Sequence, residues 1–137
     1  AAIDYVCKLE CVDENSVVIA GGSHGGFITG HCIGQYPNRF KVAIMRNPVT
    51  NIASMVSGSD IPDWCEVEAC GKKDGNGFPG DDGVWQGVGR KEVGTILTEE
   101  SLKTMFKASP IYHVQNVTTP TIIILGNKDQ RVPNYQG

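Results

Sequence analysis

Ser23 is the residue of this sequence best suited to chemistry, because it lies at the centre of the pattern Gly21-x-Ser23-x-Gly25. An apolar run at residues 17–20 precedes the pattern, and apolar residues recur at helical spacing over residues 25–36. A serine on a sharp strand-to-helix turn presents its hydroxyl to both a base and a substrate carbonyl. Gly21 and Gly25 are expected to leave out the Cβ atoms that would crowd this turn. The pattern predicts a nucleophile elbow and acyl transfer, although an ordinary glycine-rich turn fits the same letters.

A serine nucleophile needs a base, most often a histidine that a carboxylate holds in the correct tautomer. In α/β-hydrolases the three residues follow in the order serine, acid, histidine. Asp129 comes just after an apolar run at residues 121–125, which is where the acid is expected. Spacing alone fits a turn carboxylate equally well. Asp81 and Asp82 are weaker alternatives, because no strand-like run precedes them.

The base is harder to identify, since His24, His31 and His113 all precede Asp129 in the chain. The His24 ring is expected to point away from the neighbouring serine, whereas its backbone N–H is one expected oxyanion donor. His31 and His113 are expected to have structural or surface roles. We therefore expect the chain to be an internal segment of a longer hydrolase domain, with the base beyond Gly137 and the second oxyanion donor upstream.

Three apolar runs alternate with helical patterns, which predicts the α/β fold class with a mostly parallel sheet flanked by helices. The predicted strands are residues 17–20, 40–45 and 121–125. The predicted helices are the end of an amphipathic helix over 3–12, the helix 25–36, and a helix that begins at the N-cap Thr98 and ends at Ser109-Pro110. Residues 71–94 hold 8 of the 17 glycines and are predicted to be a loop or insertion.

The composition narrows the class of protein. The 137 residues have a net charge of −3, and 40% of them are hydrophobic, which suits one globular domain with a core of its own. This acidic balance argues against a nucleic acid or an anionic membrane as partner. The apolar runs are too short to span a bilayer, and the first residues do not resemble a signal peptide.

The five cysteines form an odd set whose spacing fits neither a zinc site nor a disulfide framework. They are residues 7, 11, 32, 65 and 70. Unpaired cysteines among apolar residues are typical of a reducing compartment. The sequence therefore predicts no metal site, and reduced core thiols in a cytoplasmic protein.

Several longer blocks of the sequence, besides the elbow, are typical of one family. They are residues 21–28, 33–37, 46–49, 51–55 and 60–65, with 125–126, 129 and 131–133. With these blocks the sequence resembles the acylaminoacyl-peptidases of the prolyl oligopeptidase family of serine peptidases. The resemblance implies that residues 1–137 are part of a C-terminal α/β-hydrolase domain that follows a β-propeller. It further implies that Ser23 is the nucleophile, Asp129 the triad acid, the His24 N–H an oxyanion donor and Arg131 a substrate-binding residue.

The resemblance also implies a reaction. Such a peptidase releases an N-acylated, typically N-acetylated, amino acid from the amino end of a short blocked peptide, without a metal or organic cofactor. Its relatives are cytoplasmic, and the full-length protein is expected to form an oligomer of identical chains. The block at residues 71–94 departs from the family pattern. Two alternatives stay open: a carboxylesterase-like serine hydrolase on the same fold, and a truncated product that binds peptides or partner chains without catalysis.

Overall fold

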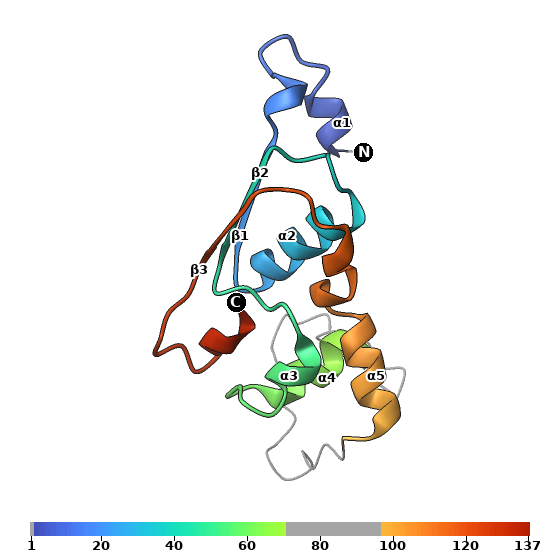
Figure 1. The fold of residues 1–137 in the computed structure, drawn as a ribbon, viewed down its shortest axis with the longest axis vertical. Coiled ribbons are helices and arrows are strands. Elements are labelled where there is room, and N and C mark those ends of the chain that lie inside the picture. The colour runs from blue at the N-terminus through green and yellow to red at the C-terminus, as the bar shows by residue number, and fades with distance from the viewer. Residues whose placement is uncertain (1, 71–96) are drawn as a thin grey trace, which may run out of the picture.

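The computed structural model describes residues 2–70 and 97–137 of the chain. Its strands are β1 (Val18–Gly22), β2 (Val42–Arg46) and β3 (Thr121–Ile124). The α-helices are α1 (Ala2–Val6), α2 (His24–Gln35), α3 (Ile52–Met55), α4 (Pro62–Cys70) and α5 (Glu99–Lys107). Three short 3-10 helices, η1 (Glu14–Ser16), η2 (Pro110–Asn116) and η3 (Asn134–Gln136), complete the elements drawn in Figure 1.

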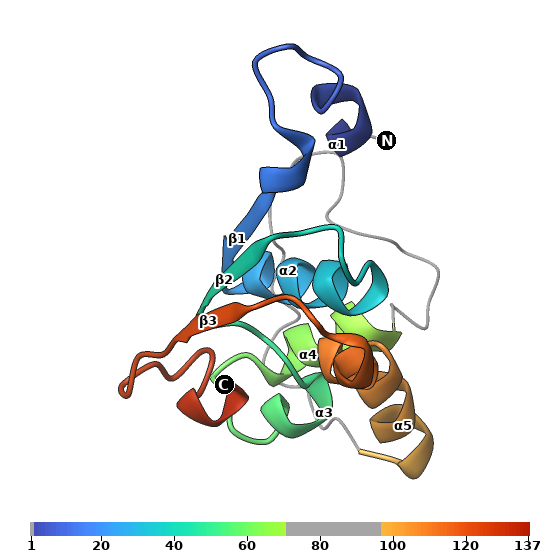
Figure 2. The same cartoon turned by 45° about the horizontal axis from the view of Figure 1, so that its top comes forward.

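The described strands form one parallel sheet in the order β1-β2-β3. Gly22 pairs with Arg46, and Arg46 pairs with Ile124, so the last residues of the three strands are level. Figure 2 shows the strands side by side, with α2 next to them. Loops that leave the carboxyl ends of parallel strands meet at one edge of the sheet, which is where α/β proteins place their ligands. The residues that follow β1, β2 and β3 are therefore brought together.

Helix α2 packs against β1 and β2 and is covered in turn by η2. The core on this face contains Ile33 of α2, Ala43 of β2 and Phe40, all of them buried. Glycines allow α2 and η2 to approach closely: a Cβ on Gly34 would lie 2.6 Å from the Cβ of His113. The apolar spacing predicts the helix but not its buried face, because Ile28 and Tyr36 are exposed, whereas small residues and Ile33 are buried.

A second core lies where α3, α4 and α5 pack together, beyond the carboxyl edge of the sheet (Figure 1). Ile52, Met55, Cys65 and Met105 are its fully buried side chains. Thr98 is the N-cap that precedes helix α5, and its hydroxyl accepts a hydrogen bond from the backbone N–H of Ser101 at 3.1 Å. This N-cap and the parallel α/β arrangement confirm the predictions.

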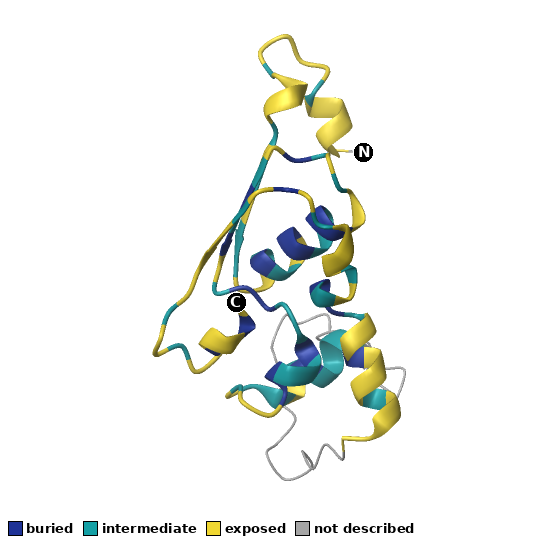
Figure 3. Ribbon diagram, in the orientation of Figure 1, coloured by how far each residue is buried: buried dark blue, intermediate teal, exposed yellow. Residues whose placement is uncertain are grey.

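Two predictions on local structure need correction. The helix predicted over residues 3–12 ends at Val6, after which the N–H of Leu9 and that of Val12 bond three residues back, as in turns. The apolar run at residues 17–20 is typical of a strand buried in a parallel sheet, but Val18 is 53% exposed. Ile122 and Ile124 of β3 are likewise about half exposed, at 54% and 50%, so one face of the sheet is open (Figure 3).

Two further statements concern only part of the chain. The predicted loop at 71–94, with Asp81 and Asp82, falls in the range 71–96, outside the described residues. None of the described helices combines the length and the apolar character needed to cross a lipid bilayer.

Candidate active site

Ser23 occupies the junction between β1 and α2, and it is exposed. Its backbone angles, φ 54° and ψ −121°, are rare for a residue with a Cβ atom. Two hydrogen bonds hold this conformation: the Ser23 N–H donates to the carbonyl of Arg46 at 2.9 Å, and the Ser23 carbonyl accepts from the N–H of Phe27 at 3.1 Å. Strain of this kind persists only where the surrounding structure imposes it. The turn therefore has the conformation that a nucleophile elbow requires.

The glycines around Ser23 differ in what they contribute. A Cβ on Gly21 would lie 2.1 Å from the carbonyl oxygen of Gly25, so only glycine fits at that position. Gly25 itself was predicted to relieve crowding, but a Cβ there would meet no described atom within 4 Å. Gly26 is the second tight position, because its Cβ would lie 2.7 Å from the Cβ of Pro48. The contact that requires glycine at 26 comes from the segment after β2, and local sequence does not reveal it.

Asp129 lies in the loop after β3, and its carboxylate accepts three hydrogen bonds. Oδ1 accepts from the backbone N–H groups of Arg131 and Val132, each at 3.0 Å. Oδ2 accepts from the side-chain amide of Asn47. The Val132 N–H and the other donors hold the pKa of Asp129 below its usual value of 3.8, although desolvation opposes them. Asp129 is therefore ionised at neutral pH and fixed in orientation.

Asn47 is a residue of this site that the sequence analysis did not single out. It follows β2 directly, its N–H donates to the carbonyl of Ile124 at 2.8 Å, and its φ of 43° lies in the left-handed region. Asparagine tolerates this region better than most residues. A useful signal in the sequence is an asparagine at the end of a predicted strand, at the same edge as the predicted nucleophile.

Arg131 is held by the segment before α4. Its Nε and Nη2 donate to the two carboxylate oxygens of Asp60 at 3.0 and 2.9 Å, and Ser59 Oγ donates to the Arg131 carbonyl at 2.7 Å. This guanidinium holds the pKa of Asp60 below its usual value of 3.8. The Arg131 side chain is nevertheless 59% exposed, so part of the guanidinium faces solvent. Its predicted part in substrate binding stays a prediction.

The His24 ring faces α4, as expected of a side chain that diverges from its neighbour. Its Nε2 lies 3.1 Å from Oε1 of Glu68, and the ring stacks on Phe27 with centroids 5.4 Å apart. Its backbone begins α2, where the first N–H groups have no intrahelical partner. The Ser23 side chain does not cap this helix end. These N–H groups can therefore face an anion, although the oxyanion role of His24 stays a prediction.

His31 lies two turns further along α2, on the same face as His24 and Phe27, and His113 lies in η2, so neither is at the turn that holds Ser23. His31 Nε2 lies 3.1 Å from the carbonyl of Ala108, its Nδ1 lies 3.0 Å from Nε2 of Gln35, and its ring contacts that of His113. Burial holds the pKa of His31 below 6.5. Both rings are structural. In the described part of the chain, no hydrogen bond joins a histidine to the hydroxyl of Ser23.

The cysteines match the prediction only in part. Cys65 is a buried core thiol, and burial raises its pKa to about 11. Cys7 and Cys32 are half-buried, but Cys11 is exposed. All four of these thiols are free. Across residues 2–70 and 97–137 no group of three or more His, Cys, Asp or Glu is arranged to hold a metal ion.

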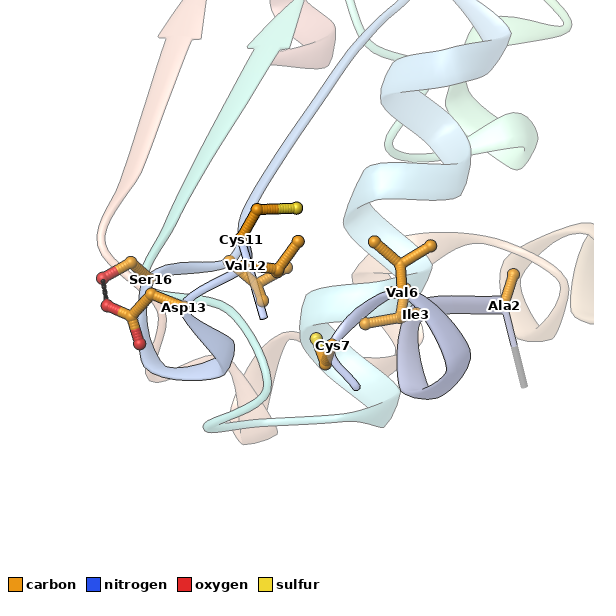
Figure 4. A pocket seen from close by; sticks show the side chains of 9 residues that line it. Ala2, Ile3, Val6, Cys7, Cys11, Val12, Asp13 and Ser16 are labelled. Carbon is orange, nitrogen blue, oxygen red and sulfur yellow. Dashed lines mark hydrogen bonds between the residues drawn. The ribbon is translucent and has the colours of Figure 1, made fainter. Parts of the chain in front are cut away.

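One apolar hollow lies far from Ser23, at the opposite end of β1. Ile3 and Val6 of α1 line it together with Cys7, Cys11 and Val12 (Figure 4). Asp13 and Ser16 at its rim are joined by a hydrogen bond of 2.5 Å. The hollow shares no residue with the carboxyl edge of the sheet, so it is not part of the candidate active site.

Comparisons with known proteins agree with this geometry. The chain is 39% identical over 136 residues to acylamino-acid-releasing enzyme 2 of Oryza sativa subsp. japonica and 41% identical to the human acylamino-acid-releasing enzyme. Each match covers 99% of this chain and 16% of the relative, so the chain spans about a sixth of the relatives' length.

Solved structures show the same fold. The Pyrococcus horikoshii acylaminoacyl peptidase superposes with a TM-score of 0.70 over 98% of this chain and 18% of its own, at 23% identity. An acylaminoacyl peptidase in complex with Z-Gly-Gly-Phe-chloromethyl ketone gives a TM-score of 0.69, also at 23% identity. The sequence model of the prolyl oligopeptidase family matches residues 1–79. Together with the α/β-hydrolase fold and the strained serine elbow, these matches establish that the chain belongs to the prolyl oligopeptidase family.

Proposed function

We propose that this chain contributes the nucleophile and the acid of a serine peptidase that releases an N-acylated amino acid from the amino end of short peptides. The observation that carries the proposal is the backbone of Ser23, an exposed serine held at φ 54° between a parallel strand and a helix. A structural serine does not need this strained conformation. The acylamino-acid-releasing relatives support the choice of substrate class.

The reaction begins at the Ser23 hydroxyl. A histidine takes the proton from Oγ while Oγ forms a bond to the carbonyl carbon of the acylated residue. The C–N bond then breaks, the leaving amine takes the proton, and an acyl-enzyme remains. Water, activated by the same histidine, breaks the ester and releases the N-acylated amino acid. The base is expected from beyond residue 137, as the family resemblance implies.

Asp129 suits the third position of this triad. Its carboxylate is ionised, and Oδ1 is occupied by two backbone donors, whereas Oδ2 accepts one hydrogen bond and can accept another. An oriented carboxylate of this kind fixes the tautomer of a histidine and stabilises its protonated form.

The start of α2 suits the oxyanion. Negative charge on the carbonyl oxygen of the substrate develops next to Ser23, where the N–H of His24 begins the helix. The helix dipole and the unpaired N–H groups both favour an anion at that point. We assign Arg131 to the peptide substrate, because its backbone N–H donates to the acid, Asp129, and its side chain, 59% exposed beside Asp60, keeps guanidinium N–H groups that can donate to a peptide carbonyl. Free thiols, one of them exposed, support a cytoplasmic location.

Fluorophosphonate labelling tests the nucleophile. We would treat the full-length native protein and the 137-residue chain with the probe, and locate the adduct by mass spectrometry. Ser23→Ala removes the hydroxyl, whereas Ser57→Ala, at another exposed serine, serves as the matched control. The proposal predicts an adduct on Ser23 of the full-length protein that is lost only in Ser23→Ala. An adduct elsewhere, or none, would refute it.

Substrate comparison tests the leaving group. Full-length protein should cleave an N-acetylated peptide faster than the same peptide with a free amino end. Hydrolysis of a simple aryl ester with no cleavage of the blocked peptide would instead favour the esterase alternative.

A further inference from the structure

We propose that Asn47 is the residue that positions the catalytic acid, coupling the orientation of the Asp129 carboxylate to the strand beside the nucleophile. This inference rests on the proposed function, because it assumes that Asp129 serves Ser23 through a histidine. It concerns a side chain to which neither the motif nor the resemblance gives a role. Asn47 touches the acid and not the substrate, so it is a positioning residue.

Asn47 links the nucleophile and the acid through the chain. The Ser23 N–H donates to the carbonyl of Arg46 at 2.9 Å, and Asn47 is the next residue. The Asn47 amide then donates to Oδ2 of Asp129. A single dipeptide, Arg46-Asn47, therefore contacts the backbone of the nucleophile on one side and the acid on the other. Ser23 and Asp129 are 106 positions apart, and this dipeptide is the short physical link between them.

Two independent features fit the Asn47 amide to its place beside Asp129. Asn47 holds φ 43°, which most side chains disfavour, while its N–H bonds to the carbonyl of Ile124 on β3. Gly126 leaves room for the amide, because a Cβ at that position would lie 3.2 Å from Nδ2 of Asn47. The left-handed backbone of Asn47 and the space left by Gly126 both allow the Asn47 amide to contact Asp129.

The two carboxylate oxygens of Asp129 are held by different parts of the chain. Oδ1 is held by the N–H groups of Arg131 and Val132, which belong to the same loop as Asp129 and move with it. Oδ2 alone is bonded to a different part of the sheet, and Asn47 supplies that bond. Without it, Oδ1 keeps its two bonds and Arg131 still anchors the loop to Asp60, but Oδ2 loses the contact that fixes its direction toward the histidine. A neutral donor is suited to this task, since it orients the carboxylate without cancelling its charge.

The test is a double-mutant cycle in the full-length protein, with the rate of fluorophosphonate labelling at Ser23 as the readout. Asn47→Gly removes the amide and accepts a positive φ, so the turn can persist. Asn38→Gly is the matched control, because Asn38 also has a positive φ, of 74°, and its side chain accepts a hydrogen bond from the exposed hydroxyl of Thr118, far from Asp129 in the fold. The cycle is completed by Asp129→Asn and by the double variant. Melting curves accompany every variant.

If Asn47 acts through Asp129, Asn47→Gly slows labelling about tenfold, the effect of losing one hydrogen bond to a charged group. Asn38→Gly labels at the wild-type rate. In the Asp129→Asn background, Asn47→Gly has no further effect. Should Asn47→Gly fail to fold, Asn47→Asp keeps the size and tolerates the left-handed backbone, but it replaces the donor with a second negative charge. It is expected to slow labelling at least as much.

Two outcomes would overturn the inference while the proposed function stands. One is a wild-type labelling rate in Asn47→Gly. The other is a loss that persists in full when Asp129 is already asparagine, which would mean a general structural role. Wild-type protein that does not label at Ser23 at all would refute the proposed function, and the inference with it, so the two failures are distinguishable.

Discussion

Gly21 and Gly25 approach each other so closely that a Cβ on Gly21 would lie 2.1 Å from the carbonyl oxygen of Gly25. The end of strand β1 and the first turn of helix α2 lie on either side of Ser23 and are thus in direct backbone contact. Because the obstacle is backbone and not a flexible side chain, the overlap cannot be relieved by a change of rotamer.

We therefore expect opposite results from two chemically identical substitutions. Gly21→Ala should destabilise the fold by about 3 kcal/mol, because the added methyl group forces the strand and helix apart. Gly25→Ala should change stability by less than about 1 kcal/mol, since the site is open and alanine favours a helix. Urea unfolding of the two variants and the wild type measures this difference, and equal losses would contradict the argument.

Arg131 gives a prediction that separates binding from stability. Its ion pair with Asp60 is exposed on both sides, at 59% and 43%, and exposed pairs contribute little to stability. Arg131→Gln should leave the melting temperature unchanged but raise KM for an N-acetylated peptide. Lys128→Gln, at another exposed cation of the same loop, is the control. An unchanged KM for Arg131→Gln would remove this residue from the substrate site.

His31 predicts a loss of stability in weak acid. Burial holds the folded-state pKa of His31 below the 6.5 of a free imidazole, so below that pH the unfolded chain binds the proton more readily. The stability that neutral His31 contributes is complete above pH 6.5 and decreases as the pH falls toward the folded-state pKa. His113, its neighbour, adds repulsion when charged.

Chemical unfolding at pH 7.5 and 5.5 tests this expectation. Between these pH values, the wild type should lose more stability than His31→Gln, in which the amide can still donate to the Ala108 carbonyl. Parallel losses in both proteins would assign the pH dependence to a group other than His31.

The thiols should differ widely in reactivity. The pKa of buried Cys65 is raised to about 11, whereas Cys11 is exposed. At pH 8 Cys65 has roughly a hundredfold less thiolate than a cysteine of pKa 9, and the reagent also cannot reach it. Iodoacetamide should modify Cys11 in the folded chain and leave Cys65 unmodified until urea is added. Rapid modification of Cys65 in the folded protein would show that the α3–α5 core opens.

Local pattern was enough to predict the features that depend on neighbours in the sequence. The three strands, the helix after Ser23 and the cap at Thr98 are encoded within a few residues each, and all are present. The short helices α3 and α4 were not predicted, because α3 is a single turn and the residues of α4 are only weakly amphipathic.

The missed features of the site are long-range contacts. Asn47 is 82 positions from Asp129, and Asp60 is 71 positions from Arg131. Neither pairing follows from spacing, because each depends on how the sheet aligns its carboxyl ends. The reason for glycine at position 26 is likewise a contact with Pro48, on a different segment.

The positive φ of Ser23 lowers the folding stability at the residue that we propose as the nucleophile. Ser23→Ala keeps the Cβ atom and with it the strained backbone, which makes that variant a faithful inactive form of the elbow. Ser23→Gly removes the strain as well as the hydroxyl, and should be more stable than Ser23→Ala by about 1 kcal/mol. Glycine would thus be the more stable residue at position 23, and the proposed role of Ser23 as nucleophile gives a reason for a serine there.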